Sequence, residues 1–170
     1  EPNTGDGAGI LFQTPHRFFR KEAQKCGCLL PDEGDYGVAM LFLPRDPELF
    51  AQARELFEQC CNDVGLPVLF WREVPVDAHD LGVTARACQP RIWQAFMVRP
   101  GSTARGEEFE RALYLARRSI EKRAHGMGLP ERDIFYVCSM SARTIVYKGM
   151  LLAGQLRTFY LDLSDATIET

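Results

Sequence analysis

Three glycines alternate around one carboxylate near the start of the chain, in the run Thr4-Gly5-Asp6-Gly7-Ala8-Gly9. Glycine allows backbone conformations and close approaches that side chains block, and loops of this kind often border active sites. The run does not fit the dinucleotide or phosphate-loop fingerprints, because a strand pattern follows it instead of a helix and no Gly-Lys-Ser or Gly-Lys-Thr ends it. Local chemistry favours a tight turn in which Asp6 bonds nearby amides.

Metal-ligand residue types are present without a metal-binding pattern. The histidines His16, His79 and His125 are far apart in the sequence. His79 lies between Asp77 and Asp80, but the sequence signals no third ligand, so we expect this group at the surface. His125 follows a basic helix end, where a cation interacts favourably with the helix dipole. No metal site is predicted.

A covalent nucleophile is not indicated either. The six cysteines show no C-x-x-C pair, and we interpret them as buried or inert thiols of a reducing compartment; they are Cys26, Cys28, Cys60, Cys61, Cys88 and Cys138. Ser139 and Ser141 lie beside a predicted strand end, where turn capping is the ordinary role. These residues favour a domain that frames a site without supplying its reactive groups.

The composition fits one globular domain, since 46% of the 170 residues are hydrophobic and 25% are charged. The formal charge of −3 lacks the basic surplus that nucleic-acid binding requires. No apolar run reaches the roughly 18 to 20 residues of a membrane span. We therefore expect neither nucleic acid nor membrane as a partner, and a cytoplasmic location.

Apolar periodicity predicts two strand-helix-strand units and flanking elements. Strands are expected at 8–14, 36–43, 68–76, 92–99 and 133–141, and helices at 15–25, 47–64 and 107–125. A hairpin partner at 143–148 and a short helix at 151–157 should follow. Segment 76–90 has no sustained period, which favours a crossover with one helical turn near 84–88, or alternatively a lid.

Five segments in order resemble the glutaminase domain of the glutamate synthase large chain. They are Thr4–Leu11, Pro75-Val76-Asp77 with Leu81-Gly82, Gln89-Pro90 with Gln94, Phe135–Ser141 and Thr144–Met150. The resemblance covers nearly the whole chain. It implies that residues 1–170 are the middle part of a class II glutamine amidotransferase domain, with the α+β, αββα sandwich of N-terminal-nucleophile hydrolases.

The resemblance also implies a reaction. In such enzymes an N-terminal Cys, with its own α-amine as base, attacks the side-chain amide of L-glutamine and releases ammonia, which is channelled to 2-oxoglutarate. The intact large chain carries FMN and an iron-sulfur cluster, whereas no cofactor is expected in this fragment. The implied partners are L-glutamine, the rest of the large chain and a flavoprotein small subunit.

This sequence departs from the family pattern at the catalytic positions. Residue 1 is Glu1, and neither Asn3 nor Asn62 precedes a glycine, as the family's oxyanion-hole asparagine does. We therefore expect the nucleophile, arginine and Asn-Gly segments to lie outside the chain, and the fragment alone to be inactive. No catalytic residue is assigned; candidates for lining the substrate site are Thr4, Gly5, Asp6 and Gly7.

Two alternatives stay open. Two strand-helix-strand units also build a ferredoxin-like fold, which would suit a regulatory module that binds a small molecule without catalysis. An amidotransferase of the same class with a different ammonia acceptor is the other.

Overall fold

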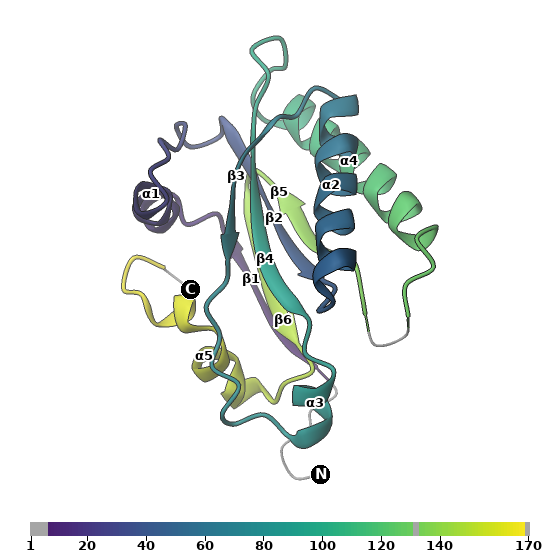
Figure 1. Ribbon diagram of the computed structural model, residues 1–170. Coiled ribbons are helices and arrows are strands. Elements are labelled where there is room, and N and C mark those ends of the chain that lie inside the picture. The colour runs from purple at the N-terminus through teal and green to yellow at the C-terminus, as the bar shows by residue number, and fades with distance from the viewer. Residues whose placement is uncertain (1–6, 131–132, 169–170) are drawn as a thin grey trace.

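The computed structural model of the chain describes residues 7–130 and 133–168. Figure 1 shows their arrangement. In chain order the elements are β1 (Ala8–Gln13), α1 (His16–Lys25), β2 (Tyr36–Leu43), α2 (Pro47–Asp63), β3 (Val68–Glu73), α3 (Val83–Ala87), β4 (Arg91–Val98), α4 (Glu107–His125), β5 (Tyr136–Ser141), β6 (Thr144–Gly149), the 3-10 turn η1 (Ala153–Gln155), α5 (Leu156–Phe159) and the 3-10 turn η2 (Leu161–Ser164). None of the helices in these ranges is both long enough and apolar enough to cross a bilayer.

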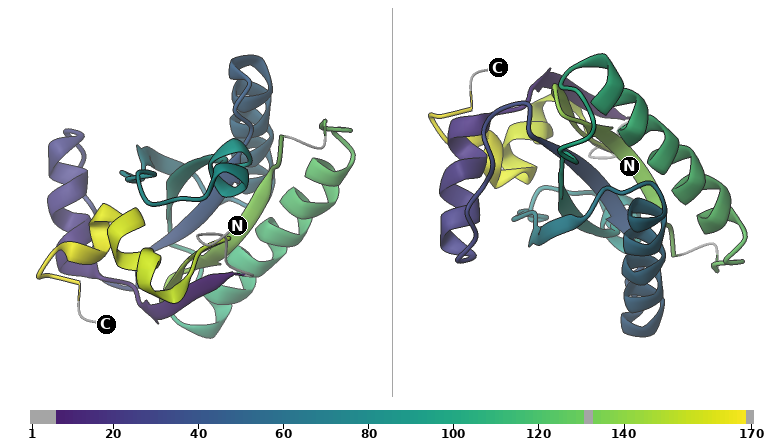
Figure 2. Two further views of the ribbon diagram at one scale, coloured as in Figure 1. Left: turned by 90° about the horizontal axis from the view of Figure 1, so that it is seen from below. Right: turned by 90° about the horizontal axis from the view of Figure 1, so that it is seen from above.

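A four-stranded antiparallel sheet forms the centre and is covered on both faces (Figures 1 and 2). Helices α2 and α4 lie side by side over one face. The second sheet, made of β1 and β6, lies on the other side together with α1 and α5. The predicted α+β architecture of antiparallel sheets between helices is confirmed.

The central sheet has the strand order β3-β4-β2-β5. Because the units β2-α2-β3 and β4-α4-β5 interleave in it, this order is that of the split βαβ, or ferredoxin-like, motif. The two units predicted from the sequence therefore form one sheet.

Strand β2 is central because it is apolar on both faces. Val38 and Met40 belong to the core shared with the β1–β6 sheet, whereas Ala39 and Leu41 pack with α2 and α4. Alternate residues of a strand point to opposite faces, so one strand serves both cores. An Asp followed by Pro is an N-cap signal in a sequence, and Asp46, before Pro47, does cap α2, since it accepts hydrogen bonds of 3.0 Å from two backbone amides of the first turn.

The predicted hairpin between 133–141 and 143–148 is wrong. Strand β6 pairs antiparallel with β1, in a different sheet from β5. Ser141 Oγ accepts hydrogen bonds from the backbone amides of Arg143 and Thr144. The Arg143 carbonyl accepts a hydrogen bond from the Thr14 amide, just after β1. The serine therefore caps the turn, as predicted, but the turn passes the chain from one sheet to the other.

Three elements differ from their predicted ranges by more than one residue. Strand β3 ends at Glu73, ahead of Pro75, which lacks an N–H for the ladder. Strand β5 begins only at Tyr136. The helix expected at 151–157 is a 3-10 turn followed by the short helix α5, an irregularity consistent with Gly154 inside it.

Candidate functional site

The glycine run leads into the edge of the two-stranded sheet. Three of its four predicted site residues, Thr4, Gly5 and Asp6, lie outside the described residues. Gly7 is exposed and has a φ of +133°, a conformation that residues with a side chain rarely adopt. That Gly7 lines a substrate site stays a prediction.

Gly9 is required by close backbone approach. It pairs with Lys148 across the β1–β6 ladder. A Cβ added at Gly9 would lie 2.8 Å from the Lys148 Cβ and 3.2 Å from the Tyr147 carbonyl oxygen. The second glycine of this part of the run therefore lets the two strands meet closely.

Two adjoining hollows open beside this edge, and we call them together the glycine-edge site. One has a volume of about 380 Å³ and the other about 130 Å³. The smaller hollow is mainly apolar and reaches under α3 and α5. Residues that line the first, some of them shared with the second, include Gly7, Gly9, Phe42, Lys148, Gly149 and Met150.

Segment 76–90 forms one wall of the glycine-edge site. Leu81 and Ala85 are buried and line the smaller hollow. Arg45 Nη1 donates to the Ala87 carbonyl at 2.6 Å, and Arg86 donates to carbonyls earlier in the segment. The Arg45 bond ties the segment to the end of β2, whereas the Arg86 bonds hold the segment together internally. Whether the segment is a crossover or a lid stays a prediction.

Lys148 supplies the cation at this site. Its Nζ donates to the Tyr136 hydroxyl at 2.6 Å and lies 4.5 Å from the centre of that ring. Its carbonyl accepts a 2.8 Å hydrogen bond from Tyr160. The exposed Cys88 also lines the smaller hollow, but its nitrogen is part of a peptide bond and provides no α-amine base. The described lining can therefore bind and orient a small molecule but offers no N-terminal nucleophile.

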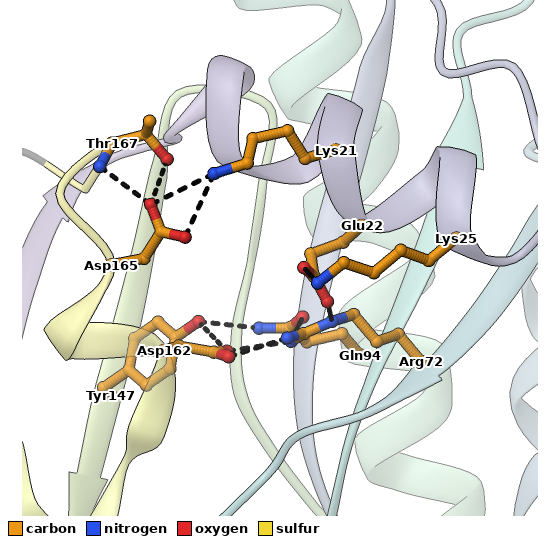
Figure 3. Close-up of polar contacts among 9 residues, drawn as sticks. All are labelled: Lys21, Glu22, Lys25, Arg72, Gln94, Tyr147, Asp162, Asp165 and Thr167. Atoms are coloured by element: carbon orange, nitrogen blue, oxygen red, sulfur yellow. Dashed lines mark hydrogen bonds and ion pairs between the residues drawn. The ribbon is translucent and has the colours of Figure 1, made fainter.

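A buried polar network lies behind β6 (Figure 3). Arg72 Nη1 and Nη2 donate to the two oxygens of Asp162 at 2.8 and 2.6 Å, and Nε donates to Glu22 at 2.9 Å. Gln94 accepts from Arg72 at 2.9 Å and donates to the Tyr147 hydroxyl at 3.0 Å, which donates to Asp162 at 2.9 Å. The network joins five elements, α1, β3, β4, β6 and η2.

The opposite charges in this network stabilise one another in their ionised forms. Desolvation opposes ionisation of Arg72, but its bonds to Asp162 and Glu22 outweigh that and raise its pKa. Burial raises the pKa of Tyr147 well above its usual value, so the hydroxyl stays protonated and donates. Sequence reasoning missed this network, although Arg72 among the apolar neighbours of β3 was a visible signal.

The network contacts the glycine-edge site through aromatic rings. The rings of Tyr147 and Tyr160 meet edge to face at 5.0 Å, and Tyr160 lines the smaller hollow. Tyr147 and Lys148 are consecutive in β6, so one points to the network and the other to the site. The network thereby supports the strand that forms the wall.

The other predicted chemical groups are dispersed. The His79 side chain is 88% exposed and pairs with Asp80 at 3.2 Å, so the expected surface location is confirmed. No group of three possible metal ligands occurs among residues 7–130 and 133–168. Of the thiols expected to be buried or inert, Cys60, Cys61 and Cys138 are buried, Cys28 is partly buried, and Cys26 and Cys88, each directly after a helix, are exposed. That the exposed thiols are inert stays a prediction.

Asp35, in the turn just before β2, forms ion pairs with Arg99 and Arg105. Hydrogen bonds from Arg105 and then Arg99 lower the pKa of Asp35 to about 2, against the opposing effect of desolvation. These ion pairs join the turn before β2 to the segment between β4 and α4.

A family model and similar known proteins indicate the same family for this chain. Residues 1–170 match the family described as glutamine amidotransferases class-II. Over 163 residues the chain is 40% identical to ferredoxin-dependent glutamate synthase 2 of Synechocystis sp., which covers 96% of this chain and 10% of that protein. It is 41% identical over 169 residues to the glutamate synthase [NADPH] large chain of Azospirillum brasilense, covering 98% and 11%. The corresponding protein of Bacillus subtilis is 38% identical over 165 residues, covering 97% and 10%. The chain thus spans about a tenth of the length of these relatives.

Proposed function

The chain belongs to the class-II glutamine amidotransferases, and from this membership we propose that it is part of the glutaminase domain of a glutamate synthase large chain. That domain would hydrolyse L-glutamine to glutamate and ammonia, with the ammonia passed to 2-oxoglutarate. The observation that carries the proposal is the similarity of nearly the whole chain to glutamate synthases.

The role proposed for these residues is to shape one wall of the glutamine site. Gly7 and Gly9 line this wall without side chains, and Gly9 allows β1 to approach β6 closely. Lys148 places a cation beside them. The lining described here lacks a cysteine with a free α-amine, so the nucleophile of the reaction would come from another part of the intact enzyme. By themselves the 170 residues would not turn over glutamine.

The intact large chain would carry FMN and an iron-sulfur cluster, and among the described residues no three possible metal ligands come together. We assign both to other parts of the large chain, with a flavoprotein small subunit as a further partner. The proposed location is the cytoplasm.

The test is glutamine hydrolysis by the intact enzyme, followed as release of glutamate and ammonia. Gly9→Val should lower kcat/KM for glutamine by at least about tenfold, since a misplaced wall of this kind can cost up to about a hundredfold in rate. Gly154→Ala is the control, because nothing lies within 4 Å of the added Cβ. An intact, folded protein that does not hydrolyse glutamine would refute the proposal.

A second candidate function has one observation in its favour. The order β3-β4-β2-β5 is the ferredoxin-like order, which fits a small-molecule-binding regulatory module without catalysis. The same assay decides, because such a module leaves the intact protein without glutaminase activity.

A further inference from the structure

Another hollow, of about 400 Å³, is lined by the end of β3, the start of β4 and the segment after α3. It shares only Gln89, Pro90 and Ile92 with the glycine-edge site. Its volume is within the roughly 300–1,000 Å³ typical of small-molecule sites. Its lining combines charged side chains with an apolar surface.

Three arginines from different parts of the chain line this hollow: Arg45 after β2, Arg86 on α3 and Arg91 on β4. Arg45 donates only through Nη1 and Arg86 only through Nη2, in each case to carbonyl groups. The Arg91 guanidinium lies over the Phe50 ring at 3.7 Å. Among the residues that the structure describes, none of the three side chains pairs with a carboxylate. Each guanidinium has five N–H donors, so most remain available for an anion.

The rest of the lining restricts the ligand further. Glu73, at the end of β3, places one negative charge in the same hollow. The partly exposed Val76 and Pro90 give the same hollow an apolar surface, above the buried Val74 and Ile92. A ligand that matches this lining has more than one anionic group, one cationic group and a short aliphatic body.

We propose that this hollow binds an acidic α-amino acid. Its two carboxylates pair with the arginines, because the guanidinium fork matches a carboxylate. Its ammonium pairs with Glu73, and its methylene groups lie on the apolar surface. This hollow adjoins the glycine-edge site through Gln89, Pro90 and Ile92, and its occupancy does not depend on glutaminase activity.

The experiment is isothermal titration calorimetry of the chain with L-glutamate, 2-oxoglutarate, L-glutamine and inorganic phosphate. L-Glutamate should bind saturably with a Kd on the order of 1 mM, the weak affinity of an open site. 2-Oxoglutarate has the same two carboxylates without the ammonium, and L-glutamine has one carboxylate fewer. Both should bind several-fold more weakly than L-glutamate.

Substitutions at Arg91, Arg45 and Glu73 test which residues bind the ligand. Arg91→Gln should weaken L-glutamate binding by about tenfold, which is the effect of losing one charge-assisted contact. Arg45→Gln serves the same purpose if the first variant does not fold. Glu73→Gln should weaken L-glutamate binding but leave 2-oxoglutarate binding unchanged. Arg111→Gln, on the exposed face of α4, is the matched control and should change nothing.

The proposal is overturned if L-glutamate shows no saturable binding, or if binding persists unchanged in folded Arg91→Gln and Arg45→Gln. Phosphate binding as tight as that of L-glutamate would show a general anion site and would overturn the assignment to an amino acid. Equal effects of Glu73→Gln on L-glutamate and 2-oxoglutarate would do the same.

Discussion

Replacing Asp162 tests how much the buried network stabilises the fold. The carboxylate accepts two hydrogen bonds from Arg72 and one from Tyr147, and its side chain is 2% exposed. Asp162→Leu leaves a guanidinium that is 6% exposed without its main counter-ion. Breaking a buried pair costs about 3–5 kcal/mol. Because Glu22 still pairs with Arg72 at 2.9 Å, we expect a loss near the lower end, about 3 kcal/mol.

A double-mutant cycle separates the pair from its surroundings. Arg72→Met should also be destabilising, since it leaves Asp162 buried with only Tyr147 as a partner. The double variant removes both charges and should lose clearly less than the sum of the two single losses. The assay is urea unfolding at pH 7, followed by tryptophan fluorescence and circular dichroism.

The control for this cycle is an exposed ion pair. Arg118 pairs with Glu121 on α4 and is 62% exposed, so Arg118→Met should cost less than about 1 kcal/mol. The reasoning fails if Asp162→Leu also costs less than about 1 kcal/mol, or if the double variant is as unstable as the two single losses added together.

Three further predictions concern other parts of the chain. The pKa of Asp35 is about 2 in the folded chain against an ordinary 3.8, so its stabilisation is present above pH ~4 and is lost as the pH falls towards 2; acid unfolding curves of Asp35→Asn should therefore drop less over this interval than those of the wild type. In a thiol titration of the native protein, Cys26 and Cys88 should react fast and the three buried cysteines only after unfolding, and fast reaction of all six would contradict the burial. Gly9→Ala should lose about 1–3 kcal/mol in urea unfolding, whereas Gly154→Ala should stay within about 0.5 kcal/mol, and equal losses would rule out the close approach.

Elements were predicted correctly where the signal comes from residues close together in the sequence. The bounds of β2 and α4 agree with the predictions because an unbroken apolar run and a regular 3.6-residue stripe each allow one interpretation. The N-cap at Asp46 followed from the Asp-Pro pair. These features depend on neighbours within a few residues.

Pairing between sheets was not predictable in the same way. The short connection between β5 and β6 suggested a hairpin, because two strands joined by a tight turn usually pair. The structure instead pairs β6 with β1, more than a hundred residues earlier in the chain. That choice depends on the apolar faces of both sheets, which no local window contains. The same applies to the Arg72–Asp162 pair, whose members are separated by 90 positions.

The network and the glycine-edge site are linked by the alternation of side chains along β6. Tyr147 points to Asp162 and Gln94, while the next residue, Lys148, lines the site and pairs with Gly9. The Tyr160 hydroxyl donates a hydrogen bond to the Lys148 carbonyl, and its ring contacts that of Tyr147. Because a glycine offers no side chain to fix its own position, the wall formed by Gly9 depends on β6 for its place. The buried charges behind β6 therefore help to hold in place the strand that positions Gly9, and they act on the site through the rings of Tyr147 and Tyr160.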